Sequence, residues 1–133
     1  MVYKRPGDRY VIKVFNQDPG YLEYLDYVLA NQSNPHVPKI KGRYMKINDD
    51  TYAVRMEELT DMDNDYGSED RRILQMIEGA DFRHAAQNAY LQEHLPQLAQ
   101  LMRDLDKMGL ENDIYYGNVM KRGDTLVITD PVR

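Results

Sequence analysis

The chain has 133 residues, of which 42% are hydrophobic and 29% charged, and its formal net charge at pH 7 is −5. This length suits a single domain, residues 1–133, built around one hydrophobic core. The acidic balance argues against nonspecific binding to nucleic acid or to an anionic membrane. The absence of cysteine excludes disulfides and thiolate metal sites and is typical of a reducing cytoplasm. No apolar run approaches the roughly 20 residues of a membrane span, so we expect a cytoplasmic protein without nucleic-acid or membrane partners.

The first third of the chain predicts strands and one helix. The segment "RYVIKVF" at 9–15 alternates and is rich in β-branched residues, which is typical of a strand. Asp18 and Pro19 then have the pattern of a helix N-cap and first turn, and we expect a helix over about 19–31. The segments "GRYMKIND" and "TYAVRME", on either side of Asp49–Asp50, predict a β-hairpin.

The middle of the chain is predicted to be mainly helical. An acidic loop, "LTDMDNDYGSEDR", contains Ser68, a suitable N-cap for a helix over about 69–78. A longer helical region covers about 82–108, and Pro96 inside it must begin a new helix or kink this one. Its last part has leucine and methionine at spacings of three and four, which indicates an amphipathic helix packed on the core.

The segment from Asp113 to the end of the printed sequence contains the polar groups that carry the functional argument. In "DIYYGNVMKRGDTLVITDP", Asp113 precedes Asn118, two short strands join at Arg122–Gly123–Asp124, and Asp130 follows the second strand. The order of elements predicts an α+β fold with a small antiparallel sheet, a helical middle and a terminal β-hairpin. Two carboxylates and a carboxamide around one hairpin suit Mg²⁺ and a phosphate ester, because hard cations prefer oxygen ligands.

The same residues have the order of the phosphoryl-transfer motifs of kinases. A catalytic-loop Asp is followed by Asn in the pattern D-x-x-x-x-N, a metal-binding Asp follows the next hairpin, and a strand lysine lies upstream. Here the corresponding segments are "YVIKVF" with Lys13, "DIYYGNVM" and "VITDPV". On these motifs the chain resembles the protein-kinase-like superfamily, and within it the early serine/threonine kinases of short-tailed bacteriophages. The resemblance runs from Tyr10 to Val132, with the helical middle matched by position.

The resemblance implies a minimal kinase-like fold, with residues 1–59 similar to an N-lobe and residues 60–133 to a reduced C-lobe. It also implies ATP and Mg²⁺ as cofactors and a host bacterial protein as the partner. The implied roles are a phosphate-pairing Lys13, a catalytic base at Asp113, metal ligands at Asn118 and Asp130, and an adenine-binding hinge at Met56, Glu57 and Leu59. Glu23 would orient Lys13, with Asp26 as the other acidic candidate on the same helix.

The sequence departs from the kinase pattern at several positions. Gly7 is the only glycine before "VIKV", so one strand and most of the glycine-rich phosphate loop are expected to be missing. Glu111 and Tyr115 stand where histidines are usual, and Pro131–Val132 replace Phe-Gly, as they do in the phage family. We expect neither an activation segment nor a large helical substrate lobe.

Three functional hypotheses follow. The first is ATP- and Mg²⁺-dependent phosphorylation of serine or threonine in a host protein. The second is a pseudokinase with weak or no activity that binds and inhibits a host defence or regulatory protein. A small-molecule kinase of the aminoglycoside-phosphotransferase kind is the third, because its loop also has the D-x-x-x-x-N pattern.

Overall fold

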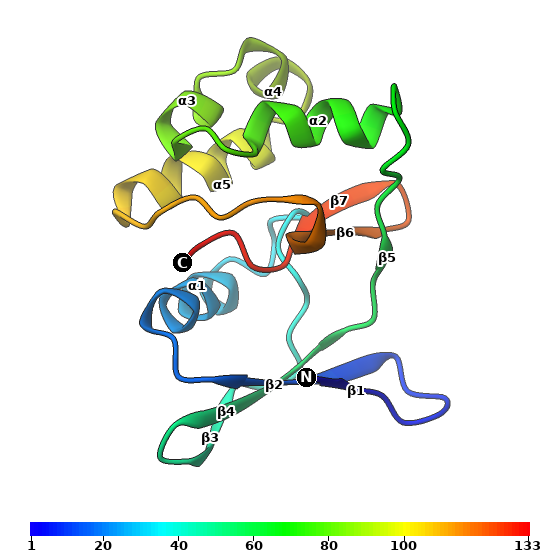
Figure 1. Ribbon diagram of the computed structural model, residues 1–133, viewed down its shortest axis with the longest axis vertical. Helices are drawn as coiled ribbons and strands as arrows, with labels where there is room; N and C mark the ends of the chain where they lie inside the picture. Colours follow the sequence, from blue (N-terminus) through cyan, green and yellow to red (C-terminus); the bar gives the residue numbers. More distant parts are fainter.

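The computed structural model describes all 133 residues. The N-terminal part of the chain forms a four-stranded antiparallel sheet (Figure 1). Its strands are ordered β1-β2-β4-β3. Their bounds are β1 Val2–Tyr3, β2 Tyr10–Asn16, β3 Met45–Asn48 and β4 Thr51–Glu57. The predicted strand at 9–15 and the predicted hairpin are both confirmed, and the two residues Asp49 and Asp50 form the turn of that hairpin.

Helix α1 (Pro19–Ala30) covers one face of this sheet (Figure 1). The side chain of Asp18 accepts a hydrogen bond from the backbone N–H of Tyr21, so the predicted cap is confirmed. Tyr24, Leu25 and Val28 are buried at spacings that place them on one side of the helix. The other face of the sheet has no helix over it.

The helical middle consists of four helices rather than one long one. They are α2 Glu69–Ile77, α3 Phe82–Ala86, α4 Ala89–His94 and α5 Pro96–Lys107. Ser68 caps α2 as predicted, and Pro96 begins α5 because its missing N–H is not needed in a first turn. None of the helices combines the length and the apolar character needed to cross a bilayer.

A second, three-stranded antiparallel sheet has the order β5-β6-β7. The predicted terminal hairpin is confirmed as β6 (Val119–Arg122) and β7 (Thr125–Ile128), and a short 3₁₀ helix, Tyr116–Asn118, leads into it. Strand β5 (Thr60–Asp61) lies in a segment that the sequence predicts to be loop. The α+β class is therefore confirmed, with a second sheet in addition to the predicted one.

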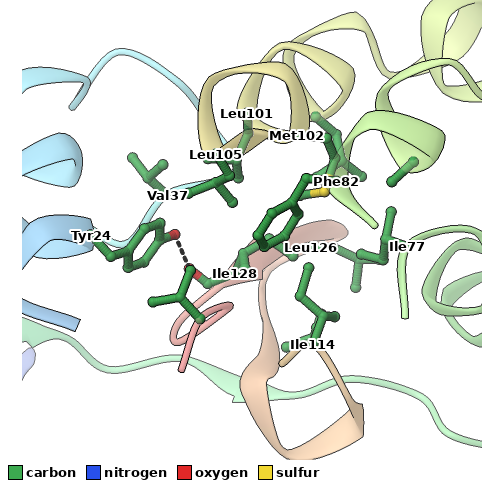
Figure 2. Packing of buried hydrophobic residues seen from close by; sticks show 14 of the residues in the cluster. Tyr24, Val37, Ile77, Phe82, Leu101, Met102, Leu105, Ile114, Leu126 and Ile128 are labelled. Atoms are coloured by element: carbon green, nitrogen blue, oxygen red, sulfur yellow. Dashed lines mark hydrogen bonds between the residues drawn. The ribbon is translucent and has the colours of Figure 1, made fainter. Parts of the chain in front are cut away.

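One core joins α1, the helical middle and the second sheet (Figure 2). On α5, the residues Leu98, Leu101, Met102 and Leu105 are fully buried, which confirms the predicted amphipathic stripe. The hydroxyl of Tyr24 donates a hydrogen bond of 2.5 Å to the backbone carbonyl of Ile128. This bond ties α1 to the end of β7 and so fixes the position of the residues that follow β7.

Candidate functional site

A cavity of about 320 Å³ lies where the first sheet meets the terminal hairpin. Strand alternation directs Val11 and Lys13 of β2 toward it, because residues two apart on a strand share a face. Six of the residues predicted from the sequence to bind nucleotide or metal line this one cavity, namely Lys13, Met56, Glu57, Leu59, Asn118 and Asp130. These residues are up to 117 positions apart in the chain, so the fold brings them together.

Lys13 is half-buried and held by Tyr21 rather than by Glu23. The Nζ atom of Lys13 donates a hydrogen bond of 3.1 Å to the Tyr21 hydroxyl and lies 4.2 Å from the centre of its ring. Burial lowers the pKa of Lys13, while the charges of Asp130 and Asp18 act in the opposite direction. Glu23 is exposed on α1 and makes no ion pair with Lys13.

Asp26, the other acid considered as a partner for Lys13, is committed elsewhere. Its side chain accepts a hydrogen bond of 2.8 Å from the Tyr44 hydroxyl. Near the start of α1, the carboxylate whose charge raises the pKa of Lys13 is instead that of the helix cap Asp18. Sequence reasoning identified Asp18 only as a cap, and its place just after the lysine strand was the available signal for a second role.

Asp130 follows the end of β7 by two residues. One of its carboxylate oxygens, Oδ1, is buried and has no hydrogen-bond partner. Burial raises the pKa of Asp130 to about 6, the charge of Lys13 opposes the shift, and the charges of Asp18 and Asp113 add to it. Burying a carboxylate without a full set of partners costs free energy. A cation bound to the Asp130 carboxylate would offset this free-energy cost.

Asn118 and Asp113 are fixed to each other and to the segment around Asp130. The side-chain amide of Asn118 donates to the carbonyl of Asp113 at 2.8 Å, and its backbone carbonyl accepts from the N–H of Thr129 at 2.9 Å. The N–H of Asp113 donates to the carbonyl of Pro131 at 2.8 Å. The two motifs "DIYYGN" and "TDP" therefore form one hydrogen-bonded unit.

The carboxylate of Asp113 lies outside the lining of the cavity. Its Oδ1 is 3.9 Å from Nε of Arg133, which is also 3.4 Å from a carboxylate oxygen of Glu111. The side chains of Arg133 and Glu111 are largely exposed and that of Asp113 is 39% exposed, so the pairs contribute little stability. The candidate base is accessible and loosely held.

The end of the cavity formed by residues 56–59, which the resemblance predicts to be a hinge, has one free backbone donor. The N–H of Glu57 donates to the carbonyl of Lys39 and the N–H of Glu58 to that of Arg9, each at 2.9 Å. The N–H of Leu59 has no acceptor in the protein. The carboxylate of Glu57 is committed to Arg122, so any ligand contact of Glu57 is through its backbone.

A single two-residue strand, β1, precedes "VIKV" and pairs with β2 through Val2↔Lys13 and Tyr3↔Ile12. The turn that joins them contains Gly7, with a φ of 83°. This turn precedes Tyr10, which pairs with Glu57 at the hinge end of the sheet. The end of this turn, at Arg9, is about 13 Å from Lys13 along β2. Gly7 therefore does not provide a loop for phosphates beside Lys13.

A second hollow, of about 440 Å³, adjoins the cavity and shares Lys13 and Asp130 with it. Asp18 and Tyr21 line its other side. Lys13 and Asp130 therefore stand between two openings, one toward the hinge and one toward the start of α1. Together these hollows provide room for a ligand longer than a single ring.

The donor set of the cavity fits Mg²⁺. Asp130 provides a carboxylate with an unpartnered oxygen, and the amide nitrogen of Asn118 is bound to Asp113, which leaves its side-chain oxygen for a cation. One or two protein carboxylate or amide oxygens are typical of Mg²⁺ sites that are completed by substrate phosphates and water. No group of three acidic or histidine side chains is placed to hold a metal without such additional ligands.

Comparison with known proteins found no match to the chain among family models, curated proteins or solved structures. The fold and the cavity define an α+β protein with a cavity that combines apolar walls with a lysine and several carboxylates.

Asp130 predicts a specific pH dependence of stability. Its folded pKa, about 6, exceeds its ordinary value of 3.8. The stability that Asp130 contributes is therefore fully present below pH 4 and is lost as pH rises through 6. In Asp130→Asn, which does not titrate, the free energy of unfolding relative to wild type should increase by about 2 kcal/mol between pH 4 and pH 7.5.

Urea denaturation at the two pH values, with EDTA present to remove divalent cations, measures this effect. Asp124→Asn, which removes an exposed carboxylate in the β6–β7 turn, is the matched control and should show no such increase. An Asp130→Asn difference that is the same at both pH values would contradict the burial argument.

Proposed function

We propose that the chain is a kinase-like nucleotide-binding protein that transfers the γ-phosphate of ATP to a serine or threonine of a host bacterial protein. The observation that carries the proposal is the convergence of Lys13, Asn118 and Asp130 on one cavity whose opposite end is the predicted hinge. The kinase-like motifs of the sequence predict these three positions independently of the cavity. Their meeting there is the main support.

The roles follow from the groups that each end of the cavity presents. The free N–H of Leu59 could donate a hydrogen bond to an acceptor nitrogen on the edge of adenine. Met56 provides an apolar wall beside it. At the other end, the ammonium of Lys13 would pair with phosphate oxygens, and Tyr21 holds it in place. Asn118 and Asp130 would hold Mg²⁺, which when bound neutralises charge on the transferring phosphate.

In the proposed reaction the hydroxyl oxygen of the substrate attacks the γ-phosphorus of ATP. The bond between that phosphorus and the β,γ-bridging oxygen breaks, ADP leaves, and the hydroxyl proton passes to the carboxylate of Asp113. The hydrogen bond from Asn118 to the carbonyl of Asp113 sets the distance between metal ligand and base. Such positioning supplies most of the catalysis in phosphoryl transfer.

A second candidate function, binding of a host protein by a pseudokinase, is favoured by the position of the Gly7 turn. Because that turn lies at the hinge end of the sheet, no backbone amides surround the γ-phosphate from the side of β1. Without them the phosphate is less shielded from water and less well oriented. In this case the biological effect would depend on surface contacts and would survive substitution of Asp113.

Calorimetric titration with ATP, with and without Mg²⁺, tests the proposal. We expect binding that requires Mg²⁺, is lost in Asp130→Ala and is retained in the control Asp124→Ala. Absence of binding at millimolar ATP would contradict the proposed nucleotide site. Binding that is independent of both the metal and Asp130 would contradict the assigned metal ligands.

A further inference from the structure

The face of the first sheet opposite the cavity is uncovered and apolar at its centre. Ile12 of β2 and Met45 and Ile47 of β3 are 38%, 64% and 53% exposed. They line a shallow hollow of about 400 Å³. In Figure 1 this side of the sheet has no helix, whereas α1 covers the opposite side. Contiguous exposed apolar surface with a polar rim is typical of interaction sites.

Three cations surround this apolar centre without carboxylate partners. Lys41, Arg43 and Arg55 line the same hollow and take part in none of the ion pairs of the molecule. All three are exposed. In a chain with a net charge of −5, these unpaired cations form a locally positive surface. We call Ile12, Met45 and Ile47 with these three cations the outer face.

We propose that the outer face binds an acidic amphipathic segment of another protein. The apolar side chains of the segment would lie on Ile12, Met45 and Ile47, and its carboxylates would pair with the surrounding cations. Arg43 and Arg55 suit carboxylates in particular, because a guanidinium binds both oxygens of a carboxylate. This inference is independent of the proposed nucleotide site, which lies on the other face of the same sheet.

The charge distribution favours an acidic peptide over other anionic partners. A nucleic acid or an anionic bilayer presents a continuous array of negative charge, which would meet the acidic remainder of the molecule as well as the three cations. A short segment contacts the outer face alone. Addition of a strand to the edge of β3 is disfavoured by the bulge between Lys46 and Asn48, so the segment should lie across the face.

Selection of random peptides of about twelve residues, displayed on yeast, against the full chain tests the proposal. Extended, such peptides span roughly 40 Å, enough to cross the sheet. We expect enrichment of peptides that combine acidic and large apolar residues. The affinity of the best synthetic peptide should fall at least about tenfold in Arg43→Glu/Arg55→Glu and also in Ile12→Ser/Met45→Ser, which leaves the charge unchanged.

The control is Arg72→Glu/Arg83→Glu, which makes the same change of charge at exposed positions on α2 and α3 and should retain binding. Circular dichroism establishes that each variant is folded. Enriched peptides without an acidic excess, or binding that both outer-face variants retain, would overturn the proposal. It would also be overturned if the Arg43→Glu/Arg55→Glu variant lost only DNA binding, vesicle binding or self-association, measured in parallel.

Discussion

Asp113→Asn should lower phosphoryl transfer about a thousandfold and leave the affinity for ATP and Mg²⁺ unchanged. Asparagine has the same shape, and the backbone carbonyl that accepts from Asn118 is retained, so the cavity should not change. What is lost is a carboxylate able to accept the proton of the attacking hydroxyl, and general-base catalysis typically contributes factors of about 10²–10⁴. Transfer of label from γ-labelled ATP to a heat-treated bacterial extract measures the rate.

Glu111→Gln is the matched control for this variant. Glu111 lies two residues before Asp113 and contacts the same Arg133, so the substitution removes a neighbouring carboxylate from the same cluster of charges. We expect full activity from Glu111→Gln. Equal transfer by wild type and Asp113→Asn would exclude Asp113 as the base. No transfer by wild type, with ATP binding intact, would instead support the pseudokinase.

Elements with strong local signals could be predicted from the sequence. The caps at Asp18 and Ser68 depend on hydrogen bonds within one turn of helix, and the start of α5 depends on the fixed φ of Pro96. By contrast, β1 and β5 have only two residues each, too few for any periodicity to appear. These two segments form strands because they pair with the edges of β2 and β6. Such pairing depends on the tertiary structure and not on the local sequence.

The candidate site was predictable as a set of residues and not as a geometry. The motif spacing selects Lys13, Asn118 and Asp130, and all three line one cavity. The partner of Lys13 was not predictable, because the choice between Glu23 and Tyr21 depends on the rotation of α1. That rotation is fixed by the burial of Tyr24 against the end of β7, a contact between residues 104 positions apart.

Arg122 is a residue whose importance is visible only in the structure. In the sequence it is the first residue of a hairpin turn, yet its guanidinium donates to Glu57 Oε2 at 2.9 Å and to the backbone carbonyls of Pro35 and Val37 at 2.9 and 3.1 Å. A second contact to Glu57 makes the pair bidentate. Arg122 therefore joins the terminal hairpin to β4 and to the loop after α1, and its partner Glu57 lines the cavity.

Arg122→Ala should lower the free energy of unfolding by about 3 kcal/mol. The side chains of Arg122 and Glu57 are only 31% and 16% exposed. The substitution removes the charge partner of a largely buried carboxylate, which keeps only the backbone N–H of Lys39, and leaves two carbonyls without their donor. Urea denaturation at pH 7.5 measures the loss. Arg83→Ala, at an exposed position on α3, should change the stability by less than about 0.5 kcal/mol.

The double variant Glu57→Ala/Arg122→Ala separates the ion pair from the contacts to the carbonyls. Removing Glu57 as well takes away the unpaired carboxylate, so the double variant should be more stable than the sum of the two single losses predicts, by about 1–2 kcal/mol. Strict additivity would mean that the pair behaves as an exposed surface ion pair. In that case the position of β4 beside the hairpin, and with it the width of the cavity, would depend on apolar packing alone.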